Sequence, residues 1–390
     1  MERKILSKNF INIWTSYAIY YFGRVNLSLI IPILIATMGM TKGELGGVVS
    51  GFLFAYAAGQ FIHGYMSEKF NPFTYISLGL ILSGVMNAFL GFAGGVFFLL
   101  FFGQVLDGLF QSMGWSSCVR STSLLYKDDD MTCVLGTSYQ IGNSIVWLIT
   151  GFIIEYFGWR WGFWTASIVM IIRGVTLYIN KPVFEIPKRT PKQQIKATLD
   201  KVTILSGVSL GLLNFIRYGV IIWIPTFLFT VHNQTIDKVG LKIFMIPIFG
   251  CAGALTYNAI KKISRETLTT IYMGVLTVII FLCAFTTGWE LTLLLAVSGF
   301  FLYGPHVFLV STIPGRKHPE QVVATSTGFI NGIGYIGAML TGVVMPTIID
   351  MGWVYAFSSW SVCCIIIIVL TPFIKNGNNN SIETLEGEKL

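Results

Sequence analysis

The chain has 390 residues, of which 54% are hydrophobic and only 11% are charged. Soluble globular proteins carry about 25% charged residues, so this composition excludes a water-soluble fold. The formal net charge of +8 would suit a nucleic-acid partner, but the positions of the cations, given below, argue against one.

Apolar stretches of roughly twenty residues, the length that crosses a bilayer core as a helix, recur along the whole chain. The first is not a cleaved signal peptide, because its apolar core is too long and no small-residue cleavage site follows. The sequence therefore predicts an all-α, multi-pass membrane protein. In chain order we expect about twelve spans, at residues 11–36, 45–66, 73–94, 96–125, 131–155, 161–180, 202–229, 238–260, 267–286, 291–313, 322–346 and 353–374.

Residues 181–201 form the longest polar stretch between predicted spans and contain three prolines and a run of cations. Such a stretch is typical of a linker. The flanking halves look related, since "GLFQSMG" at 108–114 recurs loosely as "GFFLYGP" at 299–305. We expect an N-terminal six-helix half at 1–180, the linker at 181–201, a C-terminal six-helix half at 202–374 and a tail at 375–390.

The 26 Lys and Arg residues are distributed unevenly between the two ends of the predicted helices. If the N-terminus is cytoplasmic, most of them face the cytoplasm, and only Lys42, Arg160, Lys238 and Lys242 face outward. Cytoplasmic enrichment of cations orients membrane helices, so we expect both termini to be cytoplasmic. The charge then reports topology and not a nucleic-acid partner. The short tails and the missing targeting segment favour a bacterial inner membrane, and we expect a monomer.

Two arginines stand in the middle of predicted spans: Arg24 in the first and Arg217 in the seventh, its counterpart in the second half. A cation there costs roughly 2.5–3.5 kcal/mol on insertion scales, so each needs an explanation. Arginine binds carboxylate or phosphate through two parallel hydrogen bonds, and one arginine per half could clamp an anion from both sides. The structural alternative is that Arg24 pairs with a carboxylate such as Asp107 and only packs the bundle.

Other polar and aromatic side chains recur at helical spacing within the spans, as a shared water-accessible cavity would require. For Asp107 three roles stay open: a proton carrier, a salt-bridge partner or a packing residue. His306 could be either a ligand contact or a satisfied interior histidine. The stripes comprise Tyr17, Tyr21, Arg24 and Ser28; Tyr56, Gln60 and His63; Asp107, Gln111 and Trp115; Asn214 and Arg217; Tyr303 and His306; and Thr327, Asn331 and Tyr335.

Motifs of other protein classes are missing from the sequence. No nucleophile–base pair, carboxylate dyad or metal cluster is recognisable, and the six cysteines show no metal-ligand spacing with histidine. The glycine-rich stretches lack the preceding strand and the following lysine of a nucleotide-binding loop. We therefore expect neither an enzyme nor an ATP-driven pump, and we expect no cofactor and no metal.

At these residues the chain resembles the organophosphate:phosphate antiporters of the major facilitator superfamily. The resemblance is most specific in "YYFGRVNLSLIIP" at 20–32, "GLFQSMGWSSCVR" at 108–120 and "RYGVIIWIPTFL" at 217–228. It implies the major facilitator fold and anion exchange by alternating access, with Arg24 and Arg217 as the phosphate-binding arginines. It also implies an aromatic pocket lined by Tyr17, Tyr21, Tyr56, Trp115 and Tyr335.

Two positions depart from the pattern of these antiporters. Gln60 stands where many members have a lysine, and Tyr139 or Gln140 stands where several have a histidine beside the phosphate. A phosphate monoester carries about 1.5–2 negative charges near neutral pH, so fewer pocket cations leave room for a different anion. We include Gln60, Tyr139 and His306 among the expected substrate contacts.

The sequence therefore predicts a transporter that exchanges an organic phosphate for inorganic phosphate across the lipid bilayer, with the anion held between Arg24 and Arg217. The "GRVNLS" stretch also resembles organic anion:cation symporters. The alternative is accordingly a proton-coupled symporter of a sugar acid or other carboxylate, with Asp107 or Glu155 as the proton carrier. A receptor-like sensor that binds the anion without moving it is a third possibility.

Overall fold

The computed structural model describes residues 7–67, 70–126, 129–182, 201–312 and 320–387, and every regular element within these ranges is a helix. The predicted all-α architecture is confirmed. Helix ends follow local chemistry: the Asn71 side chain accepts a hydrogen bond from the Phe73 N–H at 2.9 Å. Pro72 occupies the first turn of the helix that Asn71 caps, where a missing N–H costs nothing.

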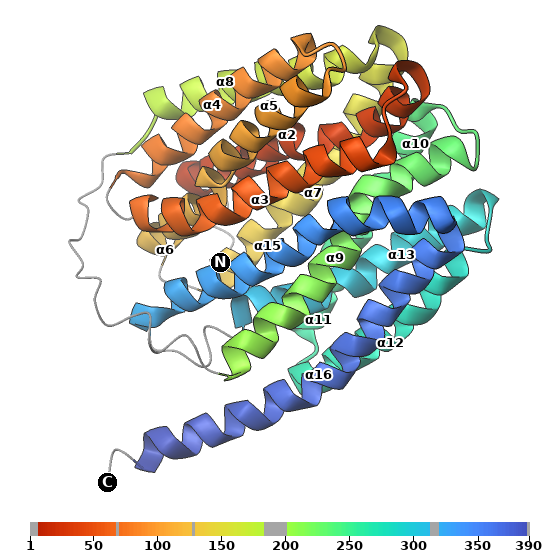
Figure 1. Ribbon diagram of the computed structural model, residues 1–390. Helices are drawn as coiled ribbons and strands as arrows, with labels where there is room; N and C mark the ends of the chain where they lie inside the picture. Colours follow the sequence, from red (N-terminus) through yellow and green to blue (C-terminus); the bar gives the residue numbers. More distant parts are fainter. Residues whose placement is uncertain (1–6, 68–69, 127–128, 183–200, 313–319, 388–390) are drawn as a thin grey trace.

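The helices fall into two groups along the chain, drawn in Figure 1. The first helix group precedes residue 183 and comprises α2 (Lys8–Met38), α3 (Lys42–Ser67), α4 (Pro72–Phe92), α5 (Phe97–Gln111), α6 (Met113–Leu125), α7 (Asp129–Phe157) and α8 (Trp159–Ile179). The second helix group follows residue 200 and comprises α9 (Lys201–Thr230), α10 (Ile236–Ile243), α11 (Met245–Ala259), α12 (Arg265–Cys283), α13 (Gly288–Val307), the π-helix η2 (Phe308–Thr312), α15 (Glu320–Met351) and α16 (Trp353–Gly387).

Eleven helical stretches of the described residues are long and apolar enough to cross a membrane. The 29-residue helix α7 corresponds to the remaining predicted span, at 131–155, and packs against α2 and α10. Three predicted spans are each built from two segments, because α5 meets α6 at Ser112, α10 meets α11 at Phe244, and α13 is followed directly by η2 at Phe308. Most of the expected linker lies outside the described residues, and α16 continues as a helix to Gly387, through most of the expected tail.

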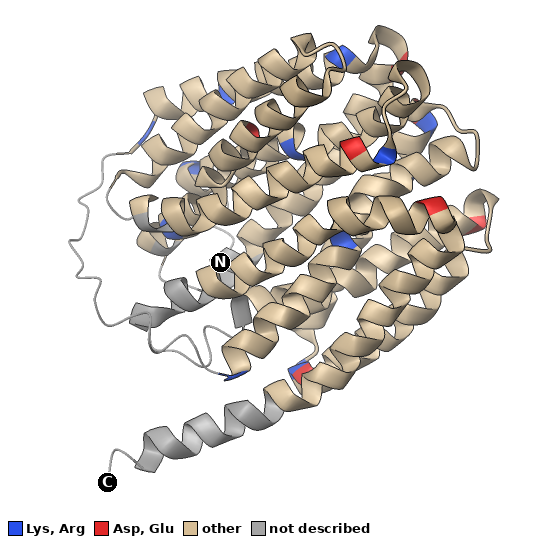
Figure 2. Cartoon of the chain, viewed as in Figure 1, with Lys and Arg blue, Asp and Glu red and all other residues tan. Residues whose placement is uncertain are grey.

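The outer surface of the bundle is apolar. Large hydrophobic side chains such as Phe102 and Val278 are about three-fifths exposed, at 60% and 59%. Figure 2 shows that charged residues gather mainly at helix ends, with isolated ones inside the bundle. Monomeric soluble proteins rarely expose such extensive apolar area, so this surface suits lipid contact.

Contacts between the two helix groups run mainly through α3 with α15, α7 with α10 and α11, and α2 with α9. Several of these contacts lie at the end of the bundle opposite residues 182 and 201, which we call the far end. There Lys42 Nζ lies 2.5 Å from Asp350 Oδ1, and Glu155 Oε2 accepts a hydrogen bond from the Ile236 N–H at 3.1 Å. Each contact sets a carboxylate of one helix group against a cation or helix N-terminus of the other.

Glycines let the helix backbones approach closely at this end. A Cβ at Gly46 of α3 would lie 2.1 Å from the Gly342 carbonyl oxygen of α15, and a Cβ at Gly240 of α10 would lie 3.3 Å from the Gly151 Cα of α7. We call these two pairs the glycine seam. Small residues of this kind allow tight helix packing inside membranes. The two helix groups are therefore in direct contact at the far end, and we call this end closed.

Candidate functional site

Arg24 of α2 is 8% exposed and points among polar and aromatic side chains of its own helix group. Its Nη2 donates to Gln111 Oε1 at 3.1 Å and its Nη1 donates to the Tyr17 hydroxyl at 3.4 Å. The guanidinium carbon lies 4.5 Å from the Tyr56 ring centroid and 4.9 Å from that of Tyr21. Cation–π contacts of this kind compensate part of the cost of removing the charge from water.

Arg217 of α9 is 3% exposed and has a different set of partners. Its Nη1 lies 3.2 Å from Asn214 Oδ1 and 2.8 Å from His306 Nε2. Because arginine can only donate, the Nε2 of His306 must be the acceptor, which places any proton of a neutral imidazole on Nδ1. The guanidinium carbon lies 4.9 Å from the Tyr218 ring centroid and 5.6 Å from that of Tyr139.

Neither guanidinium contacts a carboxylate among the residues that the structure describes. The structural alternative, a direct pair between Arg24 and Asp107, is not formed, because Gln111 takes the Nη2 of Arg24. The Nε atoms of Arg24 and Arg217 are both buried without a hydrogen-bond partner. Two buried cations with free N–H donors make a site suited to an anion, since an unpaired buried charge is costly.

Aromatic rings join the two helix groups around these arginines. The Tyr56 ring centroid of α3 lies 4.5 Å from that of Tyr335 in α15. Tyr139 of α7 lies 6.1 Å from Tyr303 of α13, and 6.2 Å from the ring of His306 on the same helix. The predicted residues Tyr56, Tyr139, His306 and Tyr335 therefore meet across the boundary between the groups.

The remaining predicted aromatic residues lie on the side of the first helix group. The Tyr17 ring packs against Trp115 with a centroid distance of 4.9 Å. Tyr21 stacks on Tyr139 at 6.1 Å. These contacts place the expected stripe of α2 beside Trp115 of α6 and Tyr139 of α7, and so connect the Arg24 side of the site to the Arg217 side.

Gln60 of α3 is buried, and its amide makes hydrogen bonds to the first helix group. Its Nε2 donates to the Ser112 carbonyl oxygen at 3.4 Å, and its Oε1 accepts from the Ser116 hydroxyl at 3.3 Å. Both partners flank the join between α5 and α6, whose backbone needs such partners. The hydrogen bonds of Gln60 therefore serve this join and reach neither arginine.

Asp107 of α5 is completely buried, at 0% exposed. It accepts hydrogen bonds from the Ser83 hydroxyl and from Asn87 Nδ2, the latter at 3.1 Å. Both donors belong to α4, so the carboxyl group joins two helices of the first group. Of the three roles left open, the direct salt bridge with Arg24 is not observed.

A narrow cavity opens beside Arg24, between α2, α3 and α5 of the first group and α9 of the second. The Nε2 of Gln104 is buried without a hydrogen-bond partner. Sequence patterns single out neither Gln104 nor Tyr218 as a site residue. Gln104 precedes Asp107 by one helical turn, and Tyr218 directly follows Arg217. These positions relative to two predicted residues are the sequence features that could have identified Gln104 and Tyr218. The lining residues are Arg24, Leu27, Ser28, Ile31, Val49, Phe52, Leu53, Gln104, Tyr218, Ile221 and Ile222.

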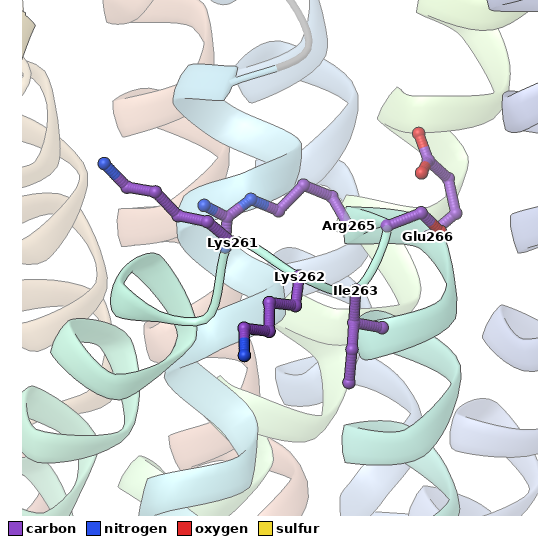
Figure 3. Close-up of a pocket in the computed structure, with 6 residues that line it drawn as sticks. Lys261, Lys262, Ile263, Arg265 and Glu266 are labelled. Atoms are coloured by element: carbon purple, nitrogen blue, oxygen red, sulfur yellow. The ribbon is translucent and has the colours of Figure 1, made fainter.

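A second hollow lies on the loop between α11 and α12 and is shown in Figure 3. It is lined by consecutive residues from Lys261 to Glu266. Arg265 is already engaged with the Tyr257 and Asn258 carbonyl oxygens, and in Figure 3 Lys261 and Lys262 point in different directions. All of its lining residues belong to one short loop, so this hollow does not join the two helix groups. The described residues contain no group of three or more His, Cys, Asp or Glu that could hold a metal ion.

Comparison with known proteins identifies relatives along nearly the whole chain. The sequence profile described as Major Facilitator Superfamily matches residues 13–342. The chain is 28% identical to a "Probable hexose phosphate transport protein" of Chlamydia pneumoniae, over 93% of this chain and 89% of the relative. It is 26% identical to the "Glycerol-3-phosphate transporter" of Bacillus subtilis strain 168, over 94% and 91%. It is 23% identical to the "Membrane sensor protein UhpC" of Salmonella typhimurium, over 93% and 90%.

A solved structure shares the architecture. A bacterial homologue of the human lysosomal transporter Spinster, in an inward-facing and unoccupied conformation, superposes with a TM-score of 0.73. The alignment covers 97% of this chain and 98% of the other at 12% identity. At this identity the likeness concerns the fold alone. The relatives agree with the resemblance found in the motifs around Arg24, Trp115 and Arg217.

Proposed function

The chain belongs to the Major Facilitator Superfamily, and on this premise we propose that it exchanges an organic phosphate for inorganic phosphate by alternating access. The relatives named for hexose phosphate and glycerol-3-phosphate support the organophosphate class. The same relatives argue against an enzyme.

One observation carries the proposal: two buried guanidiniums, one from each helix group, contact aromatic rings, keep free Nε–H donors and have no carboxylate partner in the part of the chain that the structure describes. A phosphate monoester carries about 1.5–2 negative charges, which matches two arginines. Its oxygens suit the planar donor fork of arginine better than the single ammonium of lysine. Tyr17, Tyr21, Tyr56, Trp115 and Tyr335 would then contact the organic part.

Binding would also drive the conformational change. Arg24 and Arg217 belong to helix groups that must move relative to each other, and two like charges in a low-dielectric interior repel. An anion bridging them replaces repulsion with attraction in both groups at once. The empty protein then meets a barrier to closing around the site, which favours exchange over net flux. His306 would orient Arg217 or join it as a ligand contact.

The proton-coupled alternative has less support. Asp107 is completely buried and both of its oxygens accept hydrogen bonds from α4. Glu155 lies at the far end, where it accepts from the N–H of Ile236. Neither carboxylate lines the cavity beside Arg24. The sensor reading keeps one supporting observation, the relative named as a membrane sensor protein.

For topology, we propose that the linker and both termini are cytoplasmic in a bacterial inner membrane. The start of α2 lies at the same end of the bundle as the end of α8 and the start of α9, the helices on either side of the linker in the sequence (Figure 1). Cations such as Lys181, Lys201, Lys261 and Lys262 belong to this end, in keeping with the positive-inside bias. One chain contributes both arginines, so we propose that a monomer is the working unit in the lipid bilayer.

The test is counterflow of labelled inorganic phosphate into proteoliposomes preloaded with phosphate, with sugar phosphates, glycerol phosphate and sugar acids as competitors. Arg24→Lys and Arg217→Lys keep the charge but lose the second parallel hydrogen bond, so each should lower exchange roughly 10- to 100-fold. Arg160→Lys is the matched control, because Arg160 is exposed and its guanidinium lies 4.6 Å from the Trp159 ring.

The outcomes separate the three functions. Near-normal exchange in both lysine variants would overturn the arginine clamp. Absence of phosphate exchange, together with carboxylate uptake driven by an imposed pH gradient, would establish the symporter. Phosphate binding in detergent without counterflow would indicate a sensor.

A further inference from the structure

Arg24 belongs to a hydrogen-bonded network of α4 and α5 side chains that the transport reaction as described does not use. We propose that Asp107 is a positioning residue, whose carboxylate orients the guanidinium of Arg24 through Gln111 and Ser83. This inference rests on the proposed function, because it assigns Arg24 to substrate binding. It concerns how one arginine of the clamp is held ready for the anion.

The hydrogen-bond directions in this network are determined at both ends. Arg24 can only donate, so the Gln111 atom 3.1 Å from its Nη2 must be the amide oxygen. The Gln111 nitrogen then faces the Tyr20 carbonyl oxygen at 3.0 Å, which can only accept. The amide orientation of Gln111 therefore follows from its neighbours and needs no assumption.

The same logic continues to the carboxylate. Gln111 Nε2 also donates to the Ser83 hydroxyl oxygen at 3.1 Å, so the Ser83 hydrogen is free to point onward to Asp107 Oδ1. Asn87 Nδ2 donates to the other carboxylate oxygen at 3.1 Å. Every link from Arg24 through Gln111 and Ser83 thus donates toward Asp107. Hydrogen bonds aligned in one direction polarise and strengthen one another.

Gly23 provides the opening through which the network reaches α2. A Cβ at this position would lie 2.8 Å from Gln111 Nε2 and 2.7 Å from Asn87 Nδ2, both far inside contact distance. The residue directly before the arginine therefore has no side chain at the place where α4 and α5 supply their amides. The absence of a side chain at Gly23 thus lets the Gln111 amide lie close enough to α2 to bond to Arg24.

The arrangement makes the two arginines unequal. Arg217 is held by Asn214 and His306, and no carboxylate backs either partner in the described ranges. Loss of an acceptor oxygen at Asp107 should therefore loosen the guanidinium of Arg24 while leaving that of Arg217 in place. A guanidinium that is already oriented loses less freedom when the anion binds. We therefore expect the effect in the KM for phosphate and not in the maximal rate.

The experiment is a double-mutant cycle on phosphate counterflow. Asp107→Asn keeps the shape but offers one acceptor oxygen to two donors, and Gln111→Leu removes the connecting amide. Each should raise the KM about tenfold, the value of one hydrogen bond to a charged group, with a maximal rate within about twofold of wild type. Combining the two should raise the KM no further than Gln111→Leu alone, because both act through the same link.

The matched cycle combines Asp107→Asn with His306→Phe, which removes the acceptor of the other arginine, and there the two effects should multiply. Thermal unfolding of each variant checks that it folds. Multiplication in both cycles, or a lowered maximal rate with an unchanged KM, would overturn the positioning role and leave a packing role.

The proposed function can fail separately from this inference. If the wild type shows no counterflow, the two cycles are measured instead as equilibrium binding of labelled inorganic phosphate to the protein in detergent. The same pattern in the dissociation constants then supports the positioning role without transport. A wild type that neither exchanges nor binds phosphate overturns both.

Discussion

The closed state of the far end should depend more on the steric fit of the glycine seam than on the ion pair between Lys42 and Asp350. The perturbation that tests this is Gly46→Ala in α3. An added Cβ would lie 2.1 Å from the Gly342 carbonyl oxygen, whereas carbon–oxygen contacts normally begin at about 3.3 Å. The contacted oxygen belongs to the backbone, and the next atom, Pro346 Cγ at 2.7 Å, belongs to a proline ring. No free side-chain rotation therefore relieves the overlap, and α3 must separate from α15.

The size of the effect follows from these distances. Overpacking of a tight contact costs about 1–3 kcal/mol, which shifts an equilibrium between closed and open far ends roughly 5- to 150-fold. The ion pair between Lys42 and Asp350 has side chains that are 29% and 62% exposed. Such a pair contributes about 0–1 kcal/mol, so Lys42→Ala should shift the equilibrium less than about fivefold.

The assay measures access to the seam from outside the bilayer. Ser50 lies on α3, is 7% exposed, and donates to the Met339 carbonyl oxygen of α15 at 2.8 Å. A single cysteine at this position, in a background without the native cysteines, should react with a membrane-impermeant maleimide only when the far end opens. Gly46→Ala should raise the labelling rate at least about fivefold, and Lys42→Ala should raise it less.

Gly274→Ala is the matched control, because a Cβ at Gly274 would meet nothing within 4 Å. An unchanged labelling rate in Gly46→Ala, at wild-type thermal stability, would show that the seam does not limit opening. A larger effect of Lys42→Ala than of Gly46→Ala would reverse the ranking of the two contributions.

Three further predictions address other parts of the molecule. Gly23→Ala should displace Gln111 from Arg24 and raise the KM for phosphate about tenfold, whereas Gly274→Ala should leave the KM unchanged. Equal KM values for the two variants would contradict the steric argument. His306→Gln keeps an acceptor for Arg217, so its phosphate exchange rate should stay within about threefold of wild type. The exchange rate of His306→Phe, which has no acceptor, should fall about tenfold. Equal rates for the two variants would show that the acceptor is dispensable. Burial, together with the nearby Lys242, lowers the pKa of His232 in the α9–α10 loop, so the unfolded chain binds this proton more readily than the folded protein. Stability should therefore fall as the pH drops below about 6.5, and His232→Asn should reduce the loss of thermal stability between about pH 7.5 and pH 5.5; an unchanged loss would mean that other groups control it.

The local features of this protein were readable from the sequence. Span positions follow from runs of apolar residues, because a bilayer imposes its thickness on every crossing helix. Arg24 and Arg217 stood out because a cation inside such a run is expensive wherever the helix packs. Helical spacing also placed Tyr17, Tyr21 and Arg24 on one face of one helix, which needs no knowledge of any other helix.

Only the tertiary structure decided which faces meet. Spacing along α3 places Tyr56 and Gln60 on the same face of the helix. In the structure Tyr56 contacts Arg24 and Tyr335, whereas the amide of Gln60 donates a hydrogen bond at the join between α5 and α6. A carboxylate inside a predicted span likewise made Asp107 a plausible direct partner of Arg24, but the amide of Gln111 bonds to Arg24 instead. Periodicity determines the face of a single helix, whereas a contact depends on how two helices cross and on how far each side chain reaches. Those relations arise only when the helices pack together.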